Sequence, residues 1–292
     1  MWIDKDADLH WYYQGGRQRG AQYVYADTCI ELAVTLRSLY RLPYRQLAGF
    51  MTSVVKQLGW DVIVPDYTVI NRRAKRLQID STLQHSGTTG KKYIVIDSTG
   101  LKVYGEGEWK VRQHGWSQHR TWRKLHVTVD EASGIIESCA LTTNGIHDAD
   151  MVEPLIAAIP AKEQIEKIGA DGAYDKRKVY ACLKKYNITP VIPPQKNARI
   201  SHHGNSRQVP YSRDQNIRAI RKQGRKAWKH QVNYHRRSLV ETSMYRYKTI
   251  FGDHLQSRET ERQKVEVKLK CKILNKMTQM GMPITVDVKK AV

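Results

Sequence analysis

Long apolar runs are missing from this chain of 292 residues. No stretch of eighteen apolar residues occurs, which is the length needed to cross a membrane as a helix. The first six residues also lack the basic-then-apolar pattern of a secretion signal. We therefore expect a protein that neither spans a membrane nor is secreted.

Cysteine is scarce, and its four copies do not form a pattern. Cys29, Cys139, Cys182 and Cys271 lie far apart, and no two of them form a C-x-x-C pair. This spacing argues against a zinc site or a disulfide framework. It favours scattered, buried thiols in a reducing compartment.

Acidic residues are few compared with basic ones. The sequence holds 28 Asp and Glu against 49 Lys and Arg, which gives a net charge of +21. Such a surplus is typical of proteins that bind a polyanion, most often nucleic acid. Apolar residues make up 40% of the chain, which is enough for a core and excludes a disordered polypeptide. The length suggests one large domain or two modest ones.

The positive charge is concentrated towards the C-terminus. Residues 192–292 carry a net +16 and residues 196–237 a net +11, whereas the first 90 residues carry only +3. A solvated surface loop is one explanation, but it does not account for the clustering. A basic block of this kind can neutralise phosphates and release their counterions, which favours binding to nucleic acid.

The N-terminal region predicts three short helices. Apolar residues recur at helical spacing over 26–42, 44–58 and 67–77, and Asp66 is placed to cap the third. This third segment is expected to expose a basic face made of Arg72, Arg73, Lys75 and Arg76. The pattern favours a helix-turn-helix DNA reader, and the alternative is a plain three-helix cap with a solvated basic face.

After a Ser/Thr/Gly-rich linker at 81–90, strand and helix patterns alternate. We expect strands at 92–97, 122–130, 134–143, 165–170 and 189–192, and helices at 147–159, 176–186 and 238–250. This order predicts a mixed α/β sheet layered with helices. Residues 265–273 alternate like a strand, but their Glu, Lys and Leu content favours a helix.

Two acids directly follow expected strands. Asp97 is followed by Ser-Thr-Gly and Asp171 by Gly-Ala-Tyr, so small residues leave room for a ligand at both. Asp is also common in turns, which is the alternative explanation for each acid alone. Parallel neighbouring strands would bring both carboxylates to one edge of the sheet. Clustered carboxylates select Mg²⁺ or Mn²⁺, and two such ions can clamp an in-line phosphoryl displacement.

A third acid, Glu241, lies on a late helix in a specific spacing. Arg237 precedes it by four residues, Lys248 follows it by seven, and Tyr234 stands one turn before Arg237. Helical geometry places Arg237, Glu241 and Lys248 on one face. An exposed, salt-bridged helix is the alternative, and it is weakened by the apolar residues Leu239, Val240, Met244 and Tyr247.

Several motifs carry a resemblance to a known family. They are VIDSTGLKV at 95–103, GEGEWKVRQHG at 105–115, WRKLH at 122–126, ADGAYD at 170–175, IPP at 192–194 and YHRRSLVE at 234–241. With these motifs the sequence resembles the DDE transposases of bacterial insertion sequences, in the group called insertion-sequence family five. The resemblance extends from about residue 20 to residue 286 and includes the family's Tyr-Arg-Glu-Lys signature.

The resemblance implies a fold and a set of site residues. It implies an RNase H-like mixed-sheet catalytic core at 91–256 with a basic insertion at about 195–233. We expect a helical, helix-turn-helix-like domain at 1–85 before it and a helical extension at 257–292 after it. Asp97, Asp171 and Glu241 are the implied catalytic and metal-binding triad for two Mg²⁺ or Mn²⁺ ions. The residues implied or expected to bind DNA are Tyr234, Arg236, Arg237, Lys248, Lys226, Lys229, Arg72, Arg73 and Arg76.

The expected activity is cutting and joining DNA. The enzyme would bind terminal inverted repeats, hydrolyse a phosphodiester at each end, and join the freed 3′-OH to target DNA. Stacking of Trp109 or Trp228 on an unpaired base is an alternative to ordinary packing of these rings, which we favour. No histidine is assigned a catalytic role, and His202 and His203 are expected to be solvated.

Two other functions fit parts of the pattern. One is a DNA-binding regulator without enzymatic activity, and the other is a nuclease on the same core that does not transfer strands. Transposition implies double-stranded DNA as partner and a homodimer or larger assembly, in the bacterial cytoplasm near the nucleoid. The N-terminal region is expected to be shorter than in the rest of the family branch.

Overall fold

The computed structural model describes residues 6–17, 19–20, 22–79, 90–103, 122–160, 162–201 and 211–281. Three sequence predictions fall outside these ranges: the linker at 81–90 except Gly90, the motif at 105–115 with Trp109, and His202 with His203. No helix in the described part has the length and apolar content to cross a membrane. All four cysteines are free thiols.

Three helices form the N-terminal part, as the periodicity predicted. They are α1 (Asp27–Tyr40), α2 (Tyr44–Gln57) and α3 (Tyr67–Ala74), so the third is shorter than expected. Asp66 caps α3, because its Oδ1 accepts the Thr68 backbone N–H at 2.8 Å. Trp11, Ile30, Leu47 and Ile70 are nearly fully buried at the centre of this unit. Burial of this stripe from each helix holds the three together.

A mixed sheet forms the middle of the molecule, which confirms the predicted mixed α/β architecture. Its strands are β1 (Lys92–Val103), β2 (Trp122–Asp130), β3 (Ile136–Thr143), β4 (Ile165–Gly169) and β5 (Thr189–Val191). The spatial order is β3-β2-β1-β4-β5, with β6 (His254–Leu255) paired to the end of β1. The β1–β2 and β2–β3 pairs are antiparallel, whereas β4 runs parallel to β1 and β5 parallel to β4.

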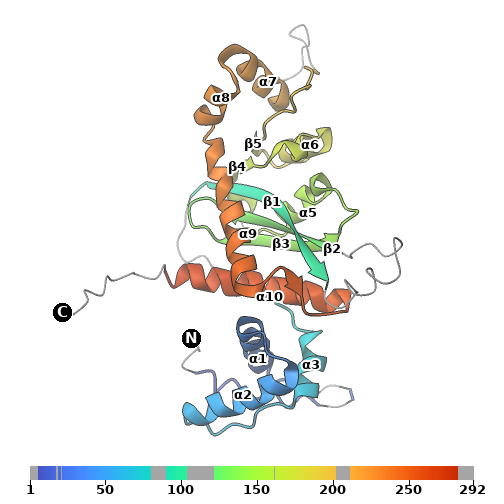
Figure 1. Cartoon of the computed structure of the whole chain (residues 1–292), viewed down its shortest axis with the longest axis vertical. Coiled ribbons are helices and arrows are strands. Elements are labelled where there is room, and N and C mark those ends of the chain that lie inside the picture. Colours follow the sequence, from blue (N-terminus) through green and yellow to red (C-terminus); the bar gives the residue numbers. More distant parts are fainter. Residues whose placement is uncertain are drawn as a thin grey trace, which may run out of the picture.

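Helices cover both faces of this sheet (Figure 1). Side chains alternate along β1, so Ile94 and Ile96 pack on one face against α5 (Val152–Ala157) and α6 (Arg177–Lys185). Val95 and Leu101 pack on the other face against α9 (Ser238–Phe251) and α10 (Thr260–Gln279). The result is a three-layer α/β/α arrangement in which α9 lies against the centre of the sheet.

Helix α10 confirms the helix expected over the ambiguous stretch at 265–273. It crosses the molecule between the sheet and the three N-terminal helices (Figure 1). Asn275 anchors it to β3 through two hydrogen bonds, both 2.8 Å long, with the backbone of Ile136. Its Lys270 and Glu266 form an ion pair that is almost completely buried. Among the described residues no strand pairs with this stretch, and its apolar side chains are buried by packing as a helix.

The basic insertion contains two helices that the sequence did not predict. They are α7 (Ser212–Gln223) and α8 (Arg225–Gln231), separated by Gly224 at φ +85°. Arg213 at the start of α7 forms a bidentate ion pair with the buried Asp175, at 2.6 and 3.0 Å. Trp228 is 1% exposed, so the prediction that this ring packs inside the protein is confirmed.

Candidate active site

Asp97 lies within β1 and not at its end. The prediction that the strand stops at this acid is wrong, because β1 continues to Val103 by pairing with β2 and then with β6. The side chain of Asp97 is 18% exposed and projects from the face that α9 covers. Its Oδ1 accepts the backbone N–H of Ser98 at 2.8 Å, which fixes the orientation of the carboxylate.

Asp171 lies just past the end of the neighbouring strand β4, at the same level as Asp97. The parallel pairing of β1 with β4 ends with Val95 opposite Gly169, and each acid follows two residues later. Asp171 is also the N-cap of the short 3₁₀ helix η3 (Gly172–Tyr174), where its Oδ1 accepts the Ala173 N–H at 2.8 Å. The parallel strands therefore bring the two acids together, as the sequence predicted.

Arg237 joins the third acid to the first. It ends the 3₁₀ helix η4 (Tyr234–Arg237), directly before α9. One guanidinium nitrogen lies 3.0 Å from Asp97 Oδ2, and the other contacts Glu241 Oε1 one helical turn further on. Glu241 itself is 52% exposed. The predicted spacing thus places Arg237 between two carboxylates that are 144 residues apart in the sequence.

The pKa of Asp97 reflects the closeness of the three acids. Burial raises its pKa most, and the negative charges of Asp171 and Glu241 raise it further. The Ser98 N–H and the Arg237 guanidinium act in the opposite direction. The three predicted carboxylates therefore lie within electrostatic reach of one another.

Tyr234 connects this site to the basic helix α8. Burial raises the pKa of its hydroxyl, and Asp171, Asp97 and Glu241 raise it further. Its ring centroid lies 6.2 Å from that of Trp228, and the Lys229 Nζ lies 5.0 Å from it. The contacts of this tyrosine bring α8 next to the carboxylates.

Lys248 is further away. It is half-buried on α9, seven residues after Glu241, which corresponds to a rise of about 10 Å along the helix. Among the described ion pairs, none joins Lys248 to the three carboxylates. The structure therefore brings Arg237 to the acids and leaves Lys248 beside them on the same helix.

The donor set suits a hard divalent cation, but the side chains are not gathered around one. Within the described ranges, no three His, Cys, Asp or Glu side chains are close enough to hold a metal ion. The Arg237 guanidinium stands between Asp97 and Glu241 and supplies the positive charge there. Three carboxylates offer the oxygen ligands that Mg²⁺ and Mn²⁺ prefer, so the chemistry of this donor set fits such ions.

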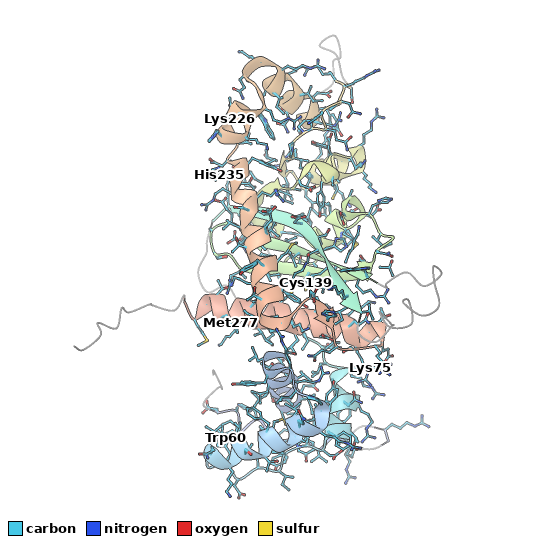
Figure 2. The ribbon with its side chains drawn as sticks, viewed as in Figure 1. Trp60, Lys75, Cys139, Lys226, His235 and Met277 are labelled. Atoms are coloured by element: carbon cyan, nitrogen blue, oxygen red, sulfur yellow. The ribbon has the colours of Figure 1, made fainter. Side chains whose placement is uncertain are left out.

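The other predicted DNA-binding residues are spread over the surface. Lys226 and Lys229 are exposed on α8, and Arg72 and Arg76 are exposed at α3. Arg236 is exposed and forms an ion pair with Glu131. Figure 2 places Lys226 near one end of the long axis of the molecule and Lys75, just after α3, towards the other.

The expectation that Arg73 is exposed is wrong, because this side chain is only 9% exposed. Its guanidinium lies 2.6 Å from Asp27 Oδ1, donates to the Tyr25 carbonyl at 3.0 Å, and lies 3.8 Å from the centroid of the Tyr23 ring. These three contacts hold α3 against α1 and the preceding segment. Arg73 therefore serves the fold of this unit.

A basic cavity of about 570 Å³ lies beside α3. Residues that the sequence did not single out contribute to it, namely Arg19, Gln22, Tyr23, Val24, Val69 and Arg262. Arg72, Arg76 and Lys75 line the same cavity. The contribution of Arg262 comes from α10, nearly 190 residues later, so no local pattern could have revealed it.

Two family models match this chain, and several solved structures are distantly similar to it. A family model described as "Transposase DDE domain" matches residues 88–276, and a second model with the same description matches residues 1–106. A solved strand transfer complex of the Drosophila P element transposase is similar at 11% identity and a TM-score of 0.31, with 59% of this chain and 38% of that chain covered.

Two further solved structures show distant similarity. For the piggyBac transposase synaptic complex with hairpin DNA, identity is 10% and the TM-score 0.40, with 94% and 69% of the two chains covered. For the Mos1 transposase paired-end complex with the left transposon end, identity is 12% and the TM-score 0.25, with 90% of this chain and 82% of that chain covered. The chain thus spans little more than a third of the P element transposase but most of the Mos1 chain.

Proposed function

Since this chain belongs to the transposase DDE domain family, we propose that it cuts DNA at the ends of an insertion sequence and joins them to a target. The observation that carries the proposal is the meeting of Asp97, Asp171 and Glu241. They come from a strand, a neighbouring parallel strand and a helix, and their charges act on one another. Terminal inverted repeats and target DNA are the proposed double-stranded substrates.

The three carboxylates are the proposed ligands of two Mg²⁺ or Mn²⁺ ions. Such ions supply Lewis-acid stabilisation to a phosphodiester under in-line attack. The protein itself holds these carboxylates in place. Hydrogen bonds from Ser98 and Ala173 orient Asp97 and Asp171, and the limited exposure of Asp97 restricts water around it.

Arg237 and Lys248 are proposed to hold DNA phosphates. Its contacts with Asp97 and Glu241 place the Arg237 guanidinium where it would bind a phosphate beside these carboxylates if cations held them. Lys248 lies further along the same helix, where it can meet an adjacent phosphate. Tyr234 fixes the start of this helix through its packing with Trp228.

We further propose that the chain falls in insertion-sequence family five. This rests on Tyr234, Arg237, Glu241 and Lys248, which have the Tyr-Arg-Glu-Lys spacing and occupy one continuous segment, η4 and α9. The strand order, with three antiparallel strands followed by two parallel ones, supports an RNase H-like core. The proposed units are 1–85, 91–256 with the insertion at about 195–233, and 257–292.

DNA is proposed to contact the molecule at two basic surfaces. One is the cavity beside α3, where Arg72 and Arg76 are exposed in a helix-turn-helix-like unit. The other is α8 with Lys226 and Lys229, which adjoins the site through Tyr234, and Arg236 lies beside it. Pairing of two DNA ends implies a homodimer or larger assembly, acting in the bacterial cytoplasm at the nucleoid.

Labelled candidate ends incubated with Mg²⁺ and a target plasmid test the proposal. Cleavage on mapped strands followed by joined product is the expected result. Cleavage without joining would instead identify a nuclease on the same core. Binding of the ends without any cleavage would identify a DNA-binding regulator and overturn the enzymatic assignment.

A further inference from the structure

A fourth acid, Asp148, lies close to the three carboxylates at the centre of a polar network. Its Oδ1 accepts the Ser98 hydroxyl at 3.0 Å and the Lys124 ammonium at 3.2 Å, and lies 3.7 Å from His126 Nδ1. Asp148 begins the 3₁₀ helix η1 (Asp148–Asp150), within the single helix that the sequence predicted at 147–159. Neither composition nor spacing had singled out this residue for the site.

The sheet itself assembles the partners of Asp148. In the β1–β2 pair, Ser98 lies opposite His126 and Gly100 opposite Lys124. Alternation along the strands puts the side chains of these residues on one face, opposite the face from which Asp97 projects. A Cβ on Gly100 would lie 3.2 Å from the Trp122 ring, so the glycine makes room for that ring on this face. Asp148 then closes over the face from the segment that follows β3.

Ser98 transmits the position of Asp148 to the site. Its side chain is held by Asp148, while its backbone N–H holds the Asp97 carboxylate at 2.8 Å. Helix η1 also packs against η3, the short helix that Asp171 caps. Asp148 is thus linked to one acid through a hydrogen-bonded residue and to the other through packed helices.

The charges of the network are arranged around a neutral histidine. His126 is fully buried, and burial lowers its pKa to about 4. The Thr142 hydroxyl donates to the Thr143 carbonyl at 3.2 Å, so it accepts from His126 Nε2 at 2.8 Å. Nδ1 is then an acceptor facing Asp148, which leaves Lys124 as the charged partner of this carboxylate.

Tyr174 shows that Asp148 shares the surroundings of the catalytic acids. This side chain is 1% exposed, and its hydroxyl has no hydrogen-bond partner among the described residues. Burial raises its pKa most, followed by the negative charges of Asp148, Asp97 and Asp171. The charges of Asp148, Asp97 and Asp171 therefore all act on this one buried hydroxyl. A buried hydroxyl without a protein partner is costly, so this position is under strain beside the three carboxylates.

We propose that Asp148 is a positioning residue, which fixes Asp97 through Ser98 and Asp171 through η3 in the geometry that binds divalent cations. This inference rests on the proposed function of the site. Groups that orient metal-binding side chains change metal affinity or activity about 10- to 100-fold when they are removed. Asp148 is therefore expected to govern metal affinity and turnover and to leave the affinity for DNA unchanged.

The test compares Asp148→Ala with Asp150→Ala, which removes an exposed acid two residues away that pairs only with Lys178 among the described residues. Calorimetric titration of the full chain with Mn²⁺ alone gives the metal affinity, and labelled ends give kcat and KM. Asp148→Ala is expected to lose about 10- to 100-fold in Mn²⁺ affinity and in kcat, with KM for DNA unchanged. Asp150→Ala is expected to match the wild type.

A second pair of variants covers the case in which Asp148→Ala does not fold. Ser98→Ala removes the hydroxyl that links Asp148 to Asp97, whereas Ser98→Thr retains it. The alanine variant is expected to show the loss and the threonine variant to restore Mn²⁺ binding. Wild-type Mn²⁺ affinity and kcat in Asp148→Ala, or in Ser98→Ala if that is the pair used, overturn the inference. A wild-type chain that neither binds Mn²⁺ nor cleaves overturns the proposed function as well.

Discussion

The guanidinium of Arg237 lies 3.0 Å from the carboxylate of Asp97, although 140 residues separate them in the sequence. Through its other nitrogen Arg237 also contacts Glu241. This single side chain balances two of the three acids that are proposed to bind metal. A divalent cation and this guanidinium therefore compete for the same carboxylates.

Replacing Arg237 by glutamine is expected to strengthen Mn²⁺ binding in the absence of DNA. Both carboxylate contacts are partly exposed, so the gain is about two- to fivefold, as for a surface ion pair. Cleavage of DNA ends is expected to weaken, because a phosphate ligand is lost. Titration with Mn²⁺ measures the first effect, and Arg246→Gln, on the same helix, is the control. Unchanged or weaker Mn²⁺ affinity in Arg237→Gln contradicts the competition.

Asp171→Asn is expected to abolish cleavage and preserve the fold. The asparagine oxygen can still accept the Ala173 N–H and cap η3, so only the charge is lost. We expect a fall in kcat of about 10⁴-fold in Mg²⁺, as when one member of a catalytic unit is removed. Single-turnover cleavage of labelled ends measures it, with thermal unfolding as the control. Cleavage at the wild-type rate would show that this acid is not catalytic.

Lys248→Ala is expected to weaken binding to DNA ends without unfolding the chain. If the ammonium contacts one phosphate, the slope of log affinity against log salt concentration falls by about 1. Fluorescence anisotropy over a salt series measures the slope. A half-buried lysine away from the core packing should change stability by no more than about 0.5 kcal/mol. A large drop in Tm would assign this lysine to the fold.

Two neighbouring arginines of α3 are expected to behave differently. Arg73→Ala removes a buried guanidinium with three contacts and should destabilise the chain by about 1–3 kcal/mol. Arg72→Ala removes an exposed one and should reduce the salt dependence of DNA binding with little change in stability. Chemical denaturation and anisotropy on both variants separate the two roles. Equal stability of the two variants would contradict the buried assignment of Arg73.

The free energy of unfolding is expected to decrease as the pH is lowered, because of His126. Its pKa is about 4 in the folded chain and 6.5 as the ordinary value, so the unfolded chain binds the proton more readily. The contribution is therefore complete above pH 6.5 and is lost as the pH falls towards 4, with a total of about 3 kcal/mol. Unfolding of wild type and His126→Gln between pH 7.5 and 4.5 measures it. A parallel decline in the two proteins would exclude His126 as the cause.

Local sequence patterns predicted those elements whose buried face is visible in the sequence as a periodic series of apolar residues. Strand β2 was predicted with its observed bounds because Leu125, Val127 and Val129 alternate on a buried face. Motifs and spacing also marked the three acids that are proposed as the triad. Asp97 and Asp171 meet because β1 and β4 pair in parallel, and Glu241 joins them from α9 through Arg237.

Features that depend on distant partners could not be predicted in this way. Strand β1 continues past Asp97 because β2 and β6 pair with its second half, and nothing near Ser98 in the sequence indicates this. Helices α7 and α8 were missed because they bury few apolar residues, among them Ile217 and Trp228. Arg73 was expected in solvent because its partners come from the segment before α1 and from α1 itself.

The short pairing of β6 with β1 has a consequence for the time at which the enzyme becomes active. Lys102 and Val103 at the end of β1 pair with His254 and Leu255, immediately after the helix that carries Glu241. That helix is thereby fastened to β1 at one end by this pairing and at the other by Arg237. During synthesis, the first two acids emerge long before either fastening exists. A nascent chain therefore holds all three acids of the proposed triad only after residue 241 has emerged, and both fastenings only after residue 255.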